Sequence, residues 1–428
     1  MIRVTQLESG VRLVTEKIPY VRSVSIGIWA GAGAATEPVH LSGISHFTEH
    51  MMFKGTTRRT AFQIAEAIDS IGGTINAFTG KEATCYYVKA IDDTFEEAAD
   101  VLVDMILHSE FAEEEMKKER SVILEEIKMS KDNPDELAVE EATDLVFRGQ
   151  ALGNSVLGTK ESLDRIDSGI MRAYVDSHYT PDRLVISVAG NFSEKKVHDY
   201  FENAFSEWKE KKPPRGKEEE KLREEVPAVQ GDREQEERQD VPFPFTKLIK
   251  RDIEQSHLCM ATKGMRFGDK RYFTMSILNN TVGGSMSSRL FQHIREDKGL
   301  AYSVYSMTGF YRAGGYFAIY AGVSHDKVGA ALEAVESELR NLKTKGIGAE
   351  ELESSRAQMK ASYLFSQEST AGRMFKNGKN VLLLDRTYDS ETLIRGFDQV
   401  TMKDIDELKE LICSLSTYSI VGVTTDEA

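Results

Sequence analysis

The sequence predicts an α+β fold of two homologous domains, each a mainly antiparallel sheet packed with helices on one face, joined by a charged linker. Three observations predict it. Apolar periods typical of strands and of helices alternate along the chain, three segments recur in the same order, and one stretch is too charged to form a core. We expect residues 1–208 to form the first domain, 209–244 the linker and 245–428 the second domain.

The elements of the first domain follow from the spacing of its apolar residues. Strands are expected at residues 11–15, 24–31, 75–79, 84–90 and 184–189. The third and fourth strands form a hairpin, because Gly80, Lys81 and Glu82 lie between them as a turn. Helices are expected at residues 43–54, 61–71, 94–108, 113–130, 134–147 and 194–207.

The second half of the chain is expected to repeat the first. The matching pairs are 111–120 with 347–356, 185–191 with 419–425, and 43–53 with 282–291. Three matches in one order, at offsets between 234 and 238, indicate an ancestral duplication. The two domains should therefore share a fold, while only one of them carries the chemistry described below.

The linker prediction depends on composition. Between residues 209 and 240, 20 of 32 residues are charged. Such a segment cannot bury enough apolar surface to offset the entropy of ordering it, so we expect a solvated linker. An electrostatic docking segment is the alternative, although charged runs are usually only solvated.

Composition also limits the compartment and the partners. The 428 residues carry a formal net charge of −15, which argues against nucleic acid because phosphate binding needs basic surfaces. Cys85, Cys259 and Cys413 lie far apart without CxxC spacing, as expected in a reducing compartment. No apolar run is long enough to cross a membrane, and the N-terminus lacks a signal-peptide core. We expect a cytoplasmic protein that binds neither nucleic acid nor membranes.

The most informative motif is the H-x-x-E-H pattern of His46, Glu49 and His50. On a helix, residues at i, i+3 and i+4 share one face, so both imidazoles and the carboxylate point the same way. Two such histidines can bind one zinc ion and leave the glutamate beside the metal-bound water. A third ligand is needed, and the alternative is a helix with two surface histidines and an ordinary glutamate.

The motif continues through residues 51–56 (MMFKGT), and here the sequence resembles the insulinase/pitrilysin family of zinc peptidases. It is most similar to the short bacterial members related to mitochondrial processing peptidase. In that family the third ligand is a glutamate in an E-R-x-x-x-x-x-E pattern, which here runs from Glu119 to Glu126. The resemblance implies Glu126 as the ligand and Glu119 as the carboxylate that orients a ligating imidazole. By chemistry alone, Glu125 remains a rival.

The resemblance also implies two groups of substrate-binding residues. The family has an Arg and a Tyr seven residues apart in its second half, and Arg295 and Tyr302 match them. A guanidinium can hold a substrate carbonyl and a phenol can donate to an oxyanion, although a plain helix end followed by a strand is the alternative. The family's edge strand pairs with an extended peptide, which implies Asn76, Ala77 and Phe78 as substrate-binding residues. A plain hairpin strand is the alternative there.

The duplication provides a comparison within the chain. The second-half counterpart of the motif falls at residues 284–288, and the counterpart of Glu126 is Ser362. Neither offers a metal ligand. We expect the second copy to keep the helical frame without ligands, and the chain to bind one Zn²⁺.

The resemblance implies a zinc-dependent endopeptidase that hydrolyses extended oligopeptides or unfolded segments, with Glu49 as general base. Short chains of this family enclose substrate by dimerising, which implies a homodimer with composite sites to which the partner supplies Arg295 and Tyr302. The alternatives are a processing protease that removes presequences or leader peptides, and an inactive core-type assembly subunit. The last would have lost zinc ligands. A zinc hydrolase of non-peptide substrates has no supporting feature.

Overall fold

The computed structural model describes residues 2–209 and 245–422, so the predicted linker 209–244 lies outside the described residues except for Lys209. The chain forms two compact units, and each is discontinuous. The first comprises residues within Met1–Ile127, Asn154–Arg233 and Phe365–Asp389, and the second comprises residues within Lys128–Gly153, Glu234–Leu364 and Ser390–Ala428. The units therefore differ from the predicted continuous domains 1–208 and 245–428, because each includes one helical segment from the other half of the sequence.

The first unit contains a six-stranded sheet in the order β1-β2-β6-β3-β5-β4. Its strands are β1 (Ile2–Gln6), β2 (Arg12–Lys17), β3 (Ser23–Ala30), β4 (Thr74–Thr79), β5 (Thr84–Ile91) and β6 (Leu184–Gly190). Only β2 and β6 pair in parallel, and every other neighbouring pair is antiparallel. In the centre, Ile28 pairs with Tyr86 on one side and Ile186 on the other. Strand β4 lies at the edge.

The second unit contains a five-stranded sheet in the order β7-β11-β8-β10-β9. Its strands are β7 (Phe245–Ile249), β8 (Ser256–Lys263), β9 (Ala301–Phe310), β10 (Gly315–Val323) and β11 (Thr417–Val421). Its first two strands, β7 and β11, are the parallel pair, and the rest are antiparallel. This strand order matches that of β2-β6-β3-β5-β4 in the first sheet, with β7 equivalent to β2 and β9 equivalent to the edge strand β4. The predicted α+β class and the two related domains are confirmed.

Helices of the first half cover one face of the first sheet. They are α1 (Ile44–Met52), α2 (Ala61–Ser70), α3 (Phe95–His108), α4 (Glu113–Asp132), α6 (Lys160–Leu163), α7 (Ser168–His178) and α8 (Glu194–Ala204). Their buried side chains, such as Phe47, Leu102 and Phe201, form one core with Ile26 and Val88 of the sheet. All the strands and helices predicted for the first half are present with ends within three residues. The prediction missed β1, α6 and α7.

The second unit has a different helix pattern where the metal motif would recur. Its helices are α5 (Pro134–Val146), α10 (Tyr272–Asn279), η7 (Asn280–Gly284), η8 (Phe291–Asp297), α11 (Val328–Lys345), α12 (Ala349–Ser366), α14 (Ser390–Asp398) and α15 (Met402–Ile412). The helical frame expected at residues 284–288 is wrong, because Ser285 is extended (φ −149°, ψ 166°) and ends η7. Gly283 leaves helical geometry there, and a Cβ on it would lie 2.4 Å from the backbone nitrogen of Ser306 in β9. The close approach of β9 therefore leaves no room for a side chain at position 283.

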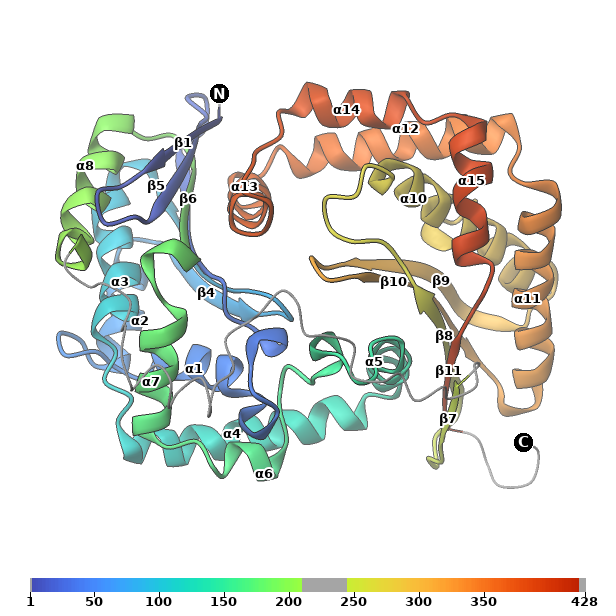
Figure 1. Ribbon diagram of the computed structural model, residues 1–428, viewed down its shortest axis with the longest axis horizontal. Helices are drawn as coiled ribbons and strands as arrows, with labels where there is room; N and C mark the ends of the chain where they lie inside the picture. Colours follow the sequence, from blue (N-terminus) through green and yellow to red (C-terminus); the bar gives the residue numbers. More distant parts are fainter. Residues whose placement is uncertain (1, 210–244, 423–428) are drawn as a thin grey trace. The chain divides into compact units, whose positions relative to one another are not determined.

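Equivalent helices are exchanged between the two halves of the sequence. Helix α13 (Thr370–Leu384) packs on β3 and β6, on the face opposite α3 and α8, and α5 packs on β8 and β11 (Figure 1). On the first sheet, the buried Glu16 carboxylate accepts hydrogen bonds from Arg373 (2.6 Å) and Asn377 (2.7 Å) of α13. A second helical layer therefore covers the sheet face that the predicted one-sided packing left open.

The repeat extends to individual side chains. Arg120 of α4 donates from Nε to the carbonyl of Leu163 (3.1 Å) and from a terminal nitrogen to that of Ile166 (2.6 Å). Arg356, 236 residues later in α12, donates in the same way to Phe397 (3.2 Å) and Val400 (2.7 Å). Each arginine thus fixes the loop that follows a helix in its own unit, which explains why both copies keep it.

Candidate metal centre

Helix α1 carries the motif and is anchored at its N-terminus. Glu37 lies six residues upstream of the N-cap Gly43, and its carboxylate accepts the N–H groups of Gly43 and Ser45 (both 2.7 Å). Gly43 itself has positive φ (+89°), and a Cβ there would lie 2.7 Å from the carbonyl oxygen of Leu157. A buried carboxylate at a helix N-terminus satisfies free N–H groups and complements the helix dipole. This anchor sets the start of the turn that carries His46.

The structure brings together one nitrogen or oxygen from each of His46, His50 and Glu126. The two Nε2 atoms are 3.2 Å apart, and Oε2 of Glu126 lies 3.7 Å from His46 Nε2 and 3.6 Å from His50 Nε2. Ligands about 2.0–2.1 Å from a tetrahedral zinc ion lie about 3.3 Å from one another. Within residues 2–209 and 245–422, this is the one group of three or more such side chains that could hold a metal ion. The donor set and its spacing fit zinc.

Periodicity did not separate Glu125 from Glu126, whereas the structure does. Oε2 of Glu126 is the carboxylate oxygen that faces both imidazoles. Glu119, two turns earlier in α4, is buried and accepts a hydrogen bond from Nδ1–H of His50 (2.9 Å). That contact selects the tautomer with a free lone pair on Nε2, the atom that faces Glu126. Each of the two glutamates thus faces an imidazole, and their roles as metal ligand and as orienting carboxylate stay predictions.

The electrostatics of His46 suit a ligand. Burial, with a smaller contribution from His50, lowers the pKa of His46 to about 3. The imidazole is therefore neutral near pH 7, which is the form that binds a metal. Among the described residues, Nδ1 of His46 has no hydrogen-bond partner although it is buried. The outer support seen at His50 thus has no counterpart at His46.

Glu49 lies on the same face of α1 but outside the group of three. Its carboxylate accepts a short hydrogen bond from the hydroxyl of Thr79, the last residue of the edge strand β4. Burial raises the pKa of Glu49, while the Thr79 hydrogen bond and the nearby His50 oppose that rise. A carboxyl group beside a metal site whose pKa is raised by burial is a candidate for proton transfer with water or substrate.

The predicted substrate strand is the edge strand. Within β4, Asn76 and Phe78 are exposed while Ala77 and Thr79 are partly buried, so the two faces alternate along the strand. Strand β4 pairs with β5 on one side only, and it packs against α1. An exposed edge beside α1 can accept an extended peptide as a further strand.

Arg295 and Tyr302 lie together in the second unit. The Arg295 guanidinium is 4.6 Å from the ring centroid of Phe291 and 5.4 Å from that of Tyr302. Gly299, with φ +58°, makes the turn between η8 and β9, and the Tyr302 ring is exposed. The pair thus forms one donor-rich cluster at the start of β9. Its relation to the metal-binding group stays a prediction.

The comparisons with known proteins identify the family of the chain. A family model described as Insulinase (Peptidase family M16) matches residues 12–160, and a second, described as Peptidase M16 inactive domain, matches residues 165–359. An uncharacterized zinc protease of Bacillus subtilis is 42% identical over 409 residues, which cover 95% of each chain. The chain belongs to peptidase family M16. An uncharacterized zinc protease of Rickettsia felis is 35% identical, over 98% of this chain and 97% of its own.

Solved structures show the same M16 fold. A crystal structure of a protease from Helicobacter pylori matches with a TM-score of 0.88 at 19% identity, covering 99% of each chain. A putative M16-like peptidase from Alicyclobacillus acidocaldarius matches with a TM-score of 0.84 at 20% identity, covering 99% of this chain and 98% of its own. None of the helices in the described part of the chain has the length and apolarity needed to cross a membrane.

Three residues of this M16 centre were not predicted from the sequence. Thr79 lies at the end of the predicted strand 75–79, but only the fold shows that its hydroxyl contacts Glu49. Lys54 lay in the extended motif, four residues after His50, and that spacing was a usable signal for a shared helix face. Glu37 lies before α1 in a segment without periodicity, so nothing in the sequence marked it.

Proposed function

We propose that this M16 chain is a zinc-dependent endopeptidase that hydrolyses extended oligopeptides or unfolded segments. The observation that carries the proposal is the arrangement of His46, His50 and Glu126, whose three ligand atoms lie within 3.2–3.7 Å of one another beside Glu49. Three protein ligands leave a fourth position open, as in catalytic zinc sites. The zinc protease names of the relatives from Bacillus subtilis and Rickettsia felis support the same conclusion.

His46, His50 and Glu126 would hold the ion, and zinc bound there supplies an acidified water and polarises a carbonyl. Glu49 would take a proton from the attacking water onto its carboxylate and pass it to the leaving amine nitrogen as the peptide C–N bond breaks. Thr79 holds one oxygen of that carboxylate, which leaves the other oxygen for proton transfer. The edge of β4, including Asn76 and Ala77, aligns the peptide through backbone hydrogen bonds with little demand on its side chains.

The remaining partners belong to the same proposal. Arg295 and Tyr302 would bind the substrate carbonyl or its oxyanion, and they would reach the zinc site of a second copy in a homodimer. One zinc ion per chain fits the match of residues 165–359 to a domain described as inactive. The three cysteines are free, which supports a reducing, cytoplasmic compartment.

The test of the chemistry is Glu49→Gln, with Glu66→Gln on the exposed surface of α2 as a matched control. Zinc content and hydrolysis of a quenched-peptide library are measured for each protein, with and without chelator. Glu49→Gln should retain one zinc per chain and lose at least about 10³-fold in activity, since the general base is removed. Substantial hydrolysis by zinc-loaded Glu49→Gln would contradict the role of Glu49.

The composite site is tested by mixing Glu49→Gln chains with Arg295→Ala chains. Each homodimer should be weakly active, whereas the mixed dimer contains one site with both residues intact and should recover activity. No recovery, with subunit exchange verified, would indicate that both residues act within one chain. A wild-type protein that binds no zinc and cleaves no peptide would indicate an inactive assembly subunit.

A further inference from the structure

The Glu119 carboxylate that supports His50 has a second partner. Oε1 accepts the hydrogen bond from His50 Nδ1 (2.9 Å), and Oε2 lies 2.7 Å from the ammonium nitrogen of Lys54. The Glu119 side chain is only 7% exposed, and that of Lys54 is 32% exposed. An ion pair with one partner this deeply buried holds its geometry more firmly than a surface pair.

Lys54 itself lies at the start of a loop that is fixed on both sides. Residues 54–60 connect α1 to α2, and Gly55 forms an isolated β-bridge with Thr60 while Thr56 forms one with Ser109 at the end of α3. The backbone N–H of Lys54 also donates to the carbonyl of Met51 in α1 (3.0 Å). The loop therefore leaves α1 along a defined path.

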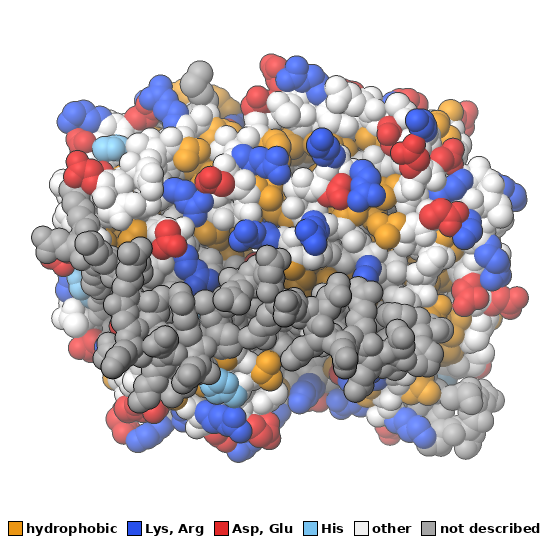
Figure 2. Space-filling view, in the orientation of Figure 1, with side chains coloured by type: hydrophobic (Ala, Val, Ile, Leu, Met, Phe, Trp, Pro, Cys, Tyr) orange, Lys and Arg blue, Asp and Glu red, His pale blue; other side chains and the backbone are white. Residues whose placement is uncertain are grey.

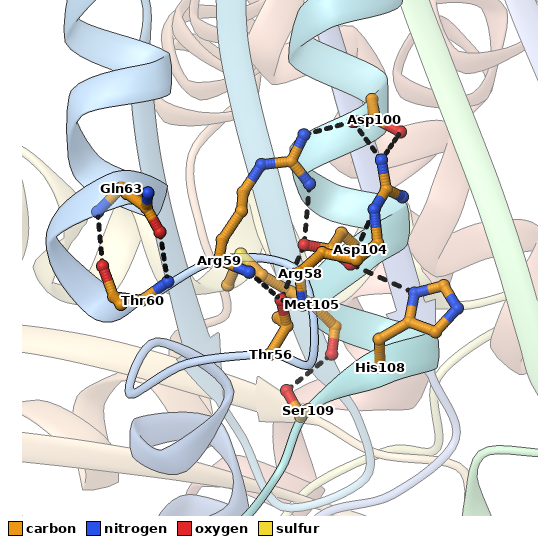
Figure 3. A network of polar contacts seen from close by, with 10 residues as sticks. All are labelled: Thr56, Arg58, Arg59, Thr60, Gln63, Asp100, Asp104, Met105, His108 and Ser109. Atoms are coloured by element: carbon orange, nitrogen blue, oxygen red, sulfur yellow. Dashed lines mark hydrogen bonds and ion pairs between the residues drawn. The ribbon is translucent and has the colours of Figure 1, made fainter.

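Side chains of the loop converge on one buried carboxylate of α3. Asp104 is fully buried, and it accepts hydrogen bonds from the Thr56 hydroxyl (2.8 Å) and the Arg59 guanidinium (2.7 Å), while His108 Nδ1 lies 3.1 Å away (Figure 3). The Thr56 hydroxyl oxygen in turn accepts the backbone N–H of Arg59 (2.9 Å). A buried carboxylate with this many partners restrains the loop, because the loop can move away only if several of these hydrogen bonds break together.

We propose that Lys54 is a positioning residue of the metal centre, which locks the Glu119 carboxylate and thereby orients His50 for the metal. Without the ammonium, the carboxylate can rotate about its terminal bond and give up the hydrogen bond that fixes the imidazole. Asp104 and the 54–60 loop present Lys54 to Glu119. The effect is concentrated on His50, because His46 Nδ1 has no such partner among the described residues. This inference rests on the zinc site proposed above.

The experiment measures the zinc dissociation constant by competition with a chromophoric chelator, which does not depend on activity. Lys54→Met should weaken zinc binding about 10-fold, the lower end of what loss of an outer-shell contact causes. Lys54→Arg keeps the cation and should stay within about 3-fold of wild type. Lys117→Met is the matched control, since the Lys117–Glu114 pair on α4 has the same 2.7 Å separation but is exposed on both sides. It should leave zinc binding unchanged.

A double-mutant cycle separates positioning from a general loss of structure. If Lys54 acts only through Glu119, then Lys54→Met combined with Glu119→Gln should bind zinc no more weakly than Glu119→Gln alone. Fully multiplicative effects would overturn the inference. So would a Lys54→Met protein that binds zinc as wild type does but shows a raised KM, since that result assigns Lys54 to substrate binding. A wild-type protein without zinc affinity would instead remove the proposed function, and this inference with it.

Discussion

The buried carboxyl group of Glu37 provides a quantitative test of how α1 is anchored. Glu37 is 6% exposed, and its two oxygens accept N–H groups from the first turn of the helix that carries the motif. Burial raises its pKa from 4.5 to about 7, although hydrogen bonds from Ser45 and Gly43 and the charge of Lys81 oppose the rise. The folded chain therefore holds this proton more tightly than the unfolded chain.

The sign and size of the stability effect follow from linkage. A group whose pKa is raised on folding contributes stability that is fully present below its unfolded pKa and is lost as pH rises through its folded pKa. A shift from 4.5 to about 7 for Glu37 corresponds to about 3 kcal/mol in total, at about 1.4 kcal/mol per pH unit. Most of it, about 2.5 kcal/mol, falls between pH 5 and pH 8.

The assay is urea unfolding of the metal-free protein in chelator at pH 5, 6, 7 and 8, for wild type and for Glu37→Gln. The glutamine cannot titrate, so other ionisable groups contribute equally to both proteins and cancel in the difference. The free energy of unfolding of wild type relative to Glu37→Gln should fall by about 2 to 3 kcal/mol from pH 5 to pH 8. Parallel curves, with a difference constant within about 0.5 kcal/mol, would refute the reasoning.

Three further predictions concern stability. Glu16→Gln should lower the free energy of unfolding by about 2 kcal/mol, because the partly buried Arg373 of α13 loses its carboxylate partner. Urea unfolding measures this difference, and a loss under about 0.5 kcal/mol would contradict the prediction. Gly43→Ala should cost more than about 2 kcal/mol, since φ is +89° and the new Cβ would meet the Leu157 carbonyl at 2.7 Å. Gly72→Ala is its control, with φ +65° but open space, and should cost about 1 kcal/mol. Chelation should lower the thermal midpoint of wild type in calorimetry, since zinc at 1,000 times its dissociation constant contributes about 4 kcal/mol; an unchanged midpoint would argue against bound zinc.

The sequence was sufficient for the features that depend on local periodicity and on the repeat. The helix and strand spans of the first half and the H-x-x-E-H face of α1 follow from short-range spacing, and the duplicated sheet follows from the repeat. The grouping of Glu126 with the two histidines came from the resemblance, since the helical period alone left Glu125 open. Geometry decides between them, because α4 turns only one of the two carboxylates toward both imidazoles.

The features that could not be predicted depend on contacts between distant segments. The exchange of α5 and α13 could not be predicted from the periodicity of either helix. An apolar stripe indicates that one face of a helix is buried, but it does not indicate which sheet that face packs against. The same holds for Lys54 and Thr79, whose partners are fixed only when α4 and β4 pack beside α1. Charge composition was equally uninformative about the site, as acidic and basic side chains are both spread over the face seen in Figure 2.

The duplication explains how one frame can carry two kinds of chemistry. Arg120 and Arg356 make the same two backbone contacts in the two units, so this part of the frame tolerates little change. The connection from β3 to the edge strand β4 in the first unit differs from its counterpart, the connection from β8 to the edge strand β9, in the second unit. In the first unit it forms α1 with its metal-binding face, and in the second it breaks at Gly283 and continues into the helix of Arg295. On the proposed function, the two copies of one connection would supply the metal-binding acid–base site and the cationic substrate-binding cluster.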